Sequence, residues 1–113
     1  MELENHSAAI AIEAENGKLY LRVSGEIDHH SAKTIREDMD RAILLYRPLT
    51  VTADLSAVTF MDSAGLGLLM GRFNTASDVG AVFSVCSPTE QITKILQMSG
   101  LDRVIPIVKK EKR

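Results

Sequence analysis

The sequence predicts an α/β fold built on a mixed β-sheet that a β-hairpin opens, with the element order β-β-α-β-α-β-α-β. Apolar residues occupy every second position between Ile10 and Ile27, which is the period of a strand. After Gly25 helical stripes alternate with short apolar runs. Because helical crossovers join parallel strands and a hairpin adds an antiparallel one, the sheet should be mixed. The length of 113 residues fits a single domain over 1–113.

The first half of the chain contains a hairpin and a helix. Asn16-Gly17 separates the two alternating runs and is the pair that most readily forms a tight two-residue turn. The apolar residues from Ile35 to Tyr46 then recur at steps of three and four, and the stripe ends before Pro48. We therefore expect a loop over 26–31 and a helix of about four turns after it.

The second half alternates strands and helices. A strand is expected over 49–55, a loop over 56–65, and a short strand over 82–85 after the break at Gly80. The apolar stripe of the helix between them should belong to the core; it comprises Leu66, Leu69, Met70 and Phe73.

Two elements close the chain. Ser87-Pro88-Thr89-Glu90 reads as a helix start with Ser87 as its cap, and Gly100 ends that helix. The run over 104–108 contains Pro106 and should form an edge strand.

Composition limits the function. The net charge of −2 disfavours nucleic-acid binding, and the lack of a long apolar run or a signal-peptide pattern disfavours a membrane and favours a cytoplasmic location. The basic tail over 109–113 is expected to be a solvated end. Cys86 is the single cysteine, and no CxxC or HExxH pattern occurs, so neither a metal nor another cofactor is expected.

The segment over 54–69 runs from a strand into a helix and is the most informative in the chain. One of Asp62 and Ser63 should cap this helix. A helix start followed by small residues also tolerates a phosphate, which makes Ser63 a candidate modification site. An enzyme is not expected: Met61 stands where a nucleophile elbow needs glycine, every histidine precedes Ser63, and no lysine of a Walker loop occurs here.

Gly67 and Gly71 lie four residues apart, on one face of the predicted helix. Each costs roughly 1 kcal/mol of helix propensity, and their missing side chains permit another backbone to approach closely. The approaching element could be the protein's own sheet or a docked partner, and the sequence leaves both open.

The motifs resemble a known family. Gly25-Glu26-Ile27-Asp28-His29-His30, Phe60-Met61-Asp62-Ser63-Ala64-Gly65-Leu66-Gly67 and Met98-Ser99-Gly100-Leu101 are similar to those of the bacterial anti-sigma-factor antagonists, whose domain is called STAS. The resemblance covers about residues 10–108. The Asp-His-His turn is closer to the stage II sporulation antagonists than to the general-stress antagonists.

This resemblance implies a phosphorylation switch. The unmodified protein would bind an anti-sigma factor that is also a serine kinase and so release the sigma factor. Phosphorylation of Ser63 would reverse this, and a phosphoserine phosphatase would restore it. The residues that the resemblance implies for partner binding are Asp28, Asp62, Ala64, Gly65 and Gly67.

Some alternatives remain at this point. Asp28 could serve only as the cap of the first long helix, a position that Ser31 could also fill. The domain could also be a STAS-type signalling or nucleotide-binding module that does not act on a sigma factor. Because their loops follow two strands joined by one helical crossover, Asp28 and Ser63 are expected to lie side by side.

Overall fold

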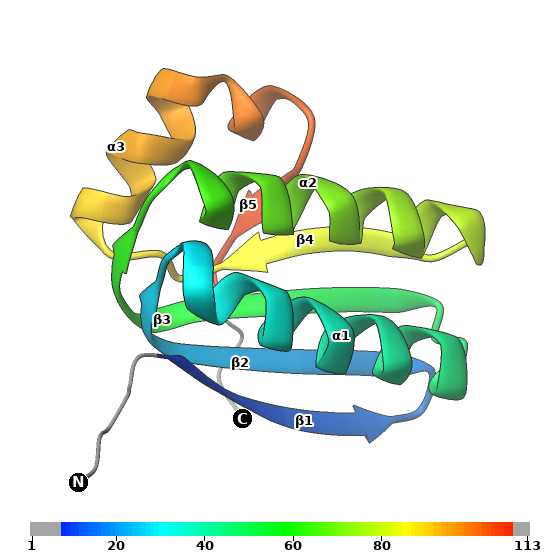
Figure 1. Ribbon diagram of the computed structural model, residues 1–113. Helices are drawn as coiled ribbons and strands as arrows, with labels where there is room; N and C mark the ends of the chain where they lie inside the picture. Colours follow the sequence, from blue (N-terminus) through cyan, green and yellow to red (C-terminus); the bar gives the residue numbers. More distant parts are fainter. Residues whose placement is uncertain (1–7, 110–113) are drawn as a thin grey trace, which may run out of the picture.

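Five strands form one mixed sheet in the order β1-β2-β3-β4-β5 in the computed structural model, which describes residues 8–109 (Figure 1). β1 (Ala8–Glu15) and β2 (Lys18–Ile27) are antiparallel and form the predicted hairpin. Asn16 and Gly17 make its turn with φ of 54° and 79°, the left-handed values that this residue pair tolerates. The prediction that the chain begins with a β-hairpin is confirmed.

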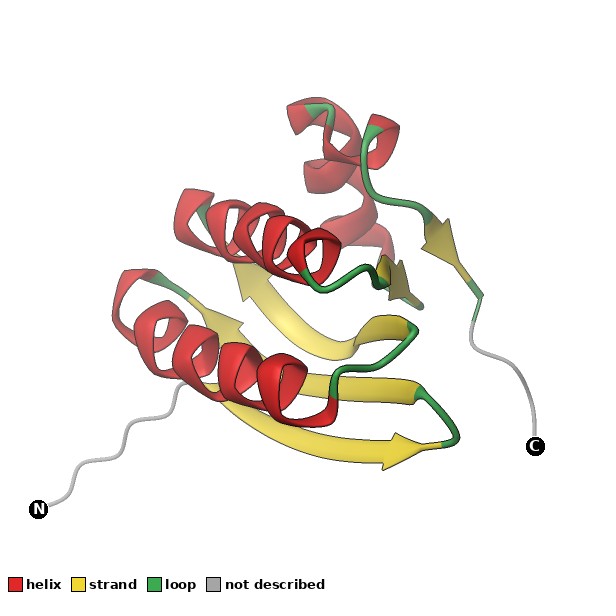
Figure 2. Ribbon diagram, turned by 90° about the vertical axis from the view of Figure 1, so that its right-hand side faces the viewer, coloured by secondary structure: helices red, strands yellow, loops and turns green. Residues whose placement is uncertain are grey.

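Parallel crossovers build the rest of the sheet, as predicted. Their elements are α1 (His29–Tyr46), β3 (Thr50–Met61), α2 (Ser63–Asp78) and β4 (Val82–Cys86). The strands follow one another in chain order, so right-handed crossovers put their helices on the same face of the sheet. Figures 1 and 2 show α1 and α2 side by side on that face.

The last elements are shorter than expected. α3 (Glu90–Ser99) and the 3-10 turn η1 (Leu101–Arg103) lead to β5 (Ile107–Val108), which pairs with β4 at the edge of the sheet. The prediction of Ser87 as the α3 cap is wrong. Ser87 has a φ of 55°, and Thr89 caps the helix by accepting a hydrogen bond from the Ile92 N–H at 3.2 Å.

The core lies between the helices and one face of the sheet. Successive strand residues alternate between the two faces, so Leu19, Leu21 and Val23 of β2 are buried under the helices. In α2, Leu69 is fully buried, whereas Leu66, Met70 and Phe73 only pack against the core edge. Leu68, which the predicted stripe omitted, is also buried.

The two expected loops are mostly regular structure. β2 and β3 continue to Ile27 and Met61, and α1 starts at His29, so the loops predicted over 26–31 and 56–65 shrink to one residue each. The pairing shifts register between Arg22 and Ser24 and again between Gly25 and Glu26. Such irregularities interrupt the two-residue alternation and hide the strand from the sequence pattern. Most of the basic tail lies outside the described residues.

Candidate functional site

The starts of α1 and α2 lie next to each other at the carboxyl edge of the sheet. Ile27 and Met61 are register partners at the ends of β2 and β3. One residue further along, the Asp62 N–H donates to the Ile27 carbonyl at 3.3 Å. The two residues that enter the helices, Asp28 and Asp62, are therefore neighbours, which confirms the predicted proximity of the two loops.

Asp28 caps α1. Its Oδ1 accepts hydrogen bonds from the N–H groups of His30 and Ser31, each at 3.0 Å, and its own N–H donates to the Ser31 Oγ at 3.0 Å. This reciprocal arrangement is a capping box, so Ser31 supports the cap and does not replace it. The hydrogen bond from the Ser31 N–H is the main cause of a lowered pKa of Asp28. Asp28 is thus a cap, and because the residue is only half-buried it is also accessible to a partner.

Asp62 caps α2 and leaves Ser63 unengaged in capping. The Asp62 Oδ1 accepts from the Ala64 N–H at 2.8 Å. Ser63 is the first residue of the helix and is exposed. Of the two residues that could have capped this helix, Asp62 does so. The Ser63 hydroxyl therefore lies at a positive helix end and within reach of another protein.

The glycines of α2 fall into two groups. Gly65 is buried, and a Cβ there would overlap Met61 and lie 3.3 Å from Ile27 Cγ2. Its missing side chain serves packing inside the domain, so among the residues expected to bind a partner it is the one without an exposed surface. A Cβ at Gly67 or Gly71 would meet no atom within 4 Å. Packing of the helix on its own sheet does not account for these two glycines.

Between α1 and α2 runs an open groove of about 390 Å³. Small residues form most of its α2 wall, namely Ala64, Gly67 and Gly71, which follow each other along the helix. Its remaining lining residues are His29, Ala32, Lys33, Arg36, Leu68 and Arg72. This groove was not predicted from the sequence, although the spacing of His29, Lys33 and Arg36 along one helix face was a usable signal.

Arg72 is the only buried arginine among the described residues, and it forms part of the groove wall. Its Nε lies 2.8 Å from Asp40 Oδ1 on α1, which ties the two helices together. Burial lowers the pKa of Arg72, Asp40 opposes this effect, and the positive charge of Arg36 lowers the pKa further.

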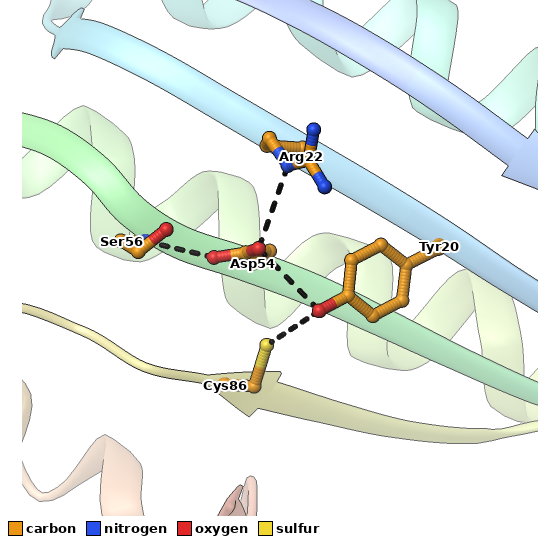
Figure 3. A network of polar contacts seen from close by, with 5 residues as sticks. All are labelled: Tyr20, Arg22, Asp54, Ser56 and Cys86. Atoms are coloured by element: carbon orange, nitrogen blue, oxygen red, sulfur yellow. Dashed lines mark hydrogen bonds and ion pairs between the residues drawn. The ribbon is translucent and has the colours of Figure 1, made fainter. Parts of the chain in front are cut away.

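A second polar cluster lies on the face of the sheet opposite α1 and α2 (Figure 3). Asp54 is fully buried; its carboxylate accepts from the Ser56 N–H at 2.9 Å and lies 3.6 Å from Arg22 Nε. The Tyr20 hydroxyl lies 3.4 Å from Asp54 and 3.3 Å from Cys86 Sγ. Burial is the main cause of a raised pKa of Tyr20, and both neighbours add to it. This cluster holds three strands together and is separate from the helix starts.

Residues 8–109 contain neither a metal-binding cluster nor a membrane-spanning helix. No three histidine, cysteine, aspartate or glutamate side chains in this part of the chain are grouped so that they could hold a metal ion. None of the helices described is long and apolar enough to cross a bilayer.

Comparisons with known proteins found a matching family model, similar sequences and similar structures. The family model described as STAS domain matches residues 9–113. The anti-sigma F factor antagonist of Paenibacillus polymyxa is 36% identical over 102 residues, which cover 90% of this chain and 87% of that protein. The anti-sigma-B factor antagonist of Bacillus subtilis is 26% identical over 98 residues, or 87% of this chain and 88% of that protein.

One solved structure, of the anti-sigma factor antagonist SpoIIAA in its unphosphorylated form, superposes with a TM-score of 0.78 at 28% identity, covering 92% of this chain and 90% of that one.

Proposed function

Since this chain belongs to the STAS domain family, we propose that it is an anti-sigma-factor antagonist that phosphorylation of Ser63 switches off. Unmodified, the protein binds an anti-sigma factor and so frees a sigma factor. It acts in the cytoplasm as a regulatory protein without catalysis of its own. The names of its relatives support the binding partner, and the position of Ser63 supports the switch.

The observation that carries the proposal is the exposed Ser63 hydroxyl beside two capped helix starts. Asp62 accepts a hydrogen bond from one N–H group at the start of α2, and Asp28 accepts from two at the start of α1, so side-chain caps order this corner before a partner arrives. An exposed hydroxyl at an ordered helix start suits a kinase, which has to align it with the γ-phosphoryl group of ATP. Ala64 carries no hydroxyl, so the residue after Ser63 offers no competing acceptor.

The anti-sigma factor is itself the kinase in this proposal. The Ser63 Oγ attacks the γ-phosphorus of ATP, the bond to the bridging oxygen breaks, ADP leaves, and the serine proton passes to solvent. A phosphoserine phosphatase later hydrolyses the ester with water, which releases inorganic phosphate and regenerates Ser63. The free protein then binds the anti-sigma factor again.

Radiolabelled ATP and the anti-sigma factor from the same genome test the switch. The native protein should incorporate one phosphate, which mass spectrometry should locate on Ser63. Ser63→Ala should take up none and still bind the anti-sigma factor. Ser77→Ala, at the exposed far end of the same helix, is the matched control and should be labelled like the native protein. Labelling of Ser63→Ala, or labelling at another residue, would contradict the assignment.

A further inference from the structure

Two positive charges in the groove between α1 and α2, those of Lys33 and Arg36, have no ion-pair partner within residues 8–109. Lys33 and Arg36 lie on its α1 wall, are exposed, and have no ion pair or hydrogen bond with any residue between 8 and 109. Arg72 contributes a third cation, and its ion pair with Asp40 neutralises part of its charge. No acidic side chain lines the groove. The chain as a whole has a net charge of −2, so this surface is opposite in sign to the molecule.

The opposite wall is shaped for close contact. Gly67 and Gly71 leave open space where a side chain would stand, so an approaching chain can reach the α2 backbone. The stretch from Ala64 to Arg72 is about 12 Å long at 1.5 Å per residue. That length matches two turns of a helix or three to four extended residues of a partner.

We propose that this groove binds an acidic segment of the anti-sigma factor, with Lys33 and Arg36 contacting its carboxylates and the two glycines admitting its backbone. This inference rests on the proposed function, because it names the surface that the same partner uses. It extends the contact from the helix starts to the middle of both helices. Complementary charge of this kind sets specificity and the rate of association.

The groove also gives the phosphate a direct effect. Ala64 is the first α2 residue in the groove wall and directly follows Ser63. A phosphate on Ser63 brings a charge of about −1.5 to −2 to the entrance of the groove. That charge has the same sign as the proposed segment, so it repels the segment and competes for the same cations.

Charge reversal tests the groove. Lys33→Glu/Arg36→Glu changes the net charge by the same amount as the control pair Arg41→Glu/Lys94→Glu, whose residues are exposed and lie outside the groove. Affinity for the anti-sigma factor should fall about tenfold or more in the groove variant and stay near native in the control. Affinity of the native protein should also fall more steeply with added salt than that of the groove variant.

Carbodiimide cross-linking locates the partner segment. The reagent joins the Lys33 ammonium group to a nearby carboxylate as an amide, and mass spectrometry should identify the linked peptide as an acidic stretch of the anti-sigma factor. If the native protein does not bind the anti-sigma factor at all, the proposed function fails. If it binds and the groove variant binds equally well with the same salt dependence, only the groove inference fails. Binding of ATP alone that the reversal abolishes, with partner affinity unchanged, would likewise overturn the inference.

Discussion

Gly65 and Gly67 are two residues apart on α2, and the molecule uses their missing side chains differently. Gly65 faces Met61 and Ile27 in the core, whereas Gly67 is exposed and faces open space. Nothing in the sequence around them separates a glycine needed for internal packing from one that leaves a surface open. The distinction depends on which way α2 is rotated over β3, and therefore on tertiary structure.

Replacing Gly65 with alanine should destabilise the domain. The added methyl group forces Met61 out of its place in a packed core, which costs about 1–3 kcal/mol. That cost exceeds the roughly 0.5–1 kcal/mol that alanine returns through helix propensity. Urea unfolding followed by circular dichroism should show a lower midpoint with an unchanged slope. A midpoint equal to or above the native value would show that Met61 moves aside freely.

Asp28 should make the stability depend on pH in the acid range. Its pKa is lowered in the folded state, mainly by the Ser31 N–H, so the folded protein binds its proton less tightly than the unfolded chain. The stabilisation is complete above the unfolded pKa of about 4 and is lost as the pH falls through the lowered folded pKa. Asp28→Asn keeps a capping side chain and removes this titration.

Thermal melts between pH 6 and pH 2.5 check this expectation. The melting temperature of the native protein should exceed that of Asp28→Asn at pH 6, and this difference should shrink as the pH falls. A gap between the two melting temperatures that stays constant over this range would contradict the argument.

At the scale of elements, α2 has a low intrinsic helix propensity at two positions and forms one wall of the groove beside α1. Gly67 and Gly71 lower the intrinsic helix propensity and fill no need inside the domain. Two alanines at these positions should raise the free energy of unfolding by about 1–2 kcal/mol in total. The same double variant should bind the anti-sigma factor more weakly, because its methyl groups narrow the groove.

Two measurements separate the effect of the glycines on stability from their effect on partner binding. Chemical denaturation measures the stability, and calorimetric titration measures the affinity. A variant that is more stable and binds as tightly as the native protein would leave the glycines without a docking role.

Most elements could be predicted from the sequence because their signals are local. The Asn16-Gly17 turn and the three- and four-residue steps of α1 each follow from a few neighbouring residues. The second half of β3 could not, since its residues pair with β2 across shifted registers that only the assembled sheet defines. Arg72 was missed for a similar reason: its burial and its partner Asp40 depend on how α1 and α2 pack.

The candidate site divides in the same way. The shared edge of Asp28 and Ser63 follows from strand order and crossover rules, which are properties of the topology. The groove depends on the rotation of two helices about their axes, which a single helical stripe does not define. Helix caps are predicted less well when several candidate residues are adjacent, as in Ser87-Pro88-Thr89. Ser87 has a left-handed backbone, and Thr89 caps α3 in its place.

For the whole molecule, phosphorylation should block binding and leave the fold intact. Ser63 is exposed and lies outside the buried core, so the phosphate desolvates nothing in the free protein. The α2 dipole favours the added negative charge by roughly 0.3–2 kcal/mol, and the Asp62 carboxylate that caps the same helix opposes part of this effect. Burial of the same charge under a partner that offers no dedicated cation costs several kcal/mol. Because 1.4 kcal/mol corresponds to a tenfold change in affinity, this cost weakens binding about a hundredfold or more.

Paired measurements on the two forms check this mechanism. The circular dichroism spectra and melting temperatures of the phosphorylated and unphosphorylated protein should nearly coincide. Calorimetric titration with the anti-sigma factor should give tight binding for the unphosphorylated form alone. A large fall in melting temperature on phosphorylation would point to unfolding as the switch.

The short connections at the helix starts also affect how fast the protein binds its partner. Asp28 and Asp62 are each the single residue between a strand and a helix, and the Asp62 N–H donates a hydrogen bond to the Ile27 carbonyl. A corner held this tightly has no slow rearrangement to complete before it meets its partner. In stopped-flow mixing, the observed rate constant should therefore rise in proportion to the anti-sigma factor concentration without reaching a plateau. The response time of the circuit would then depend on the turnover of the kinase and the phosphatase, and the antagonist itself would add no delay.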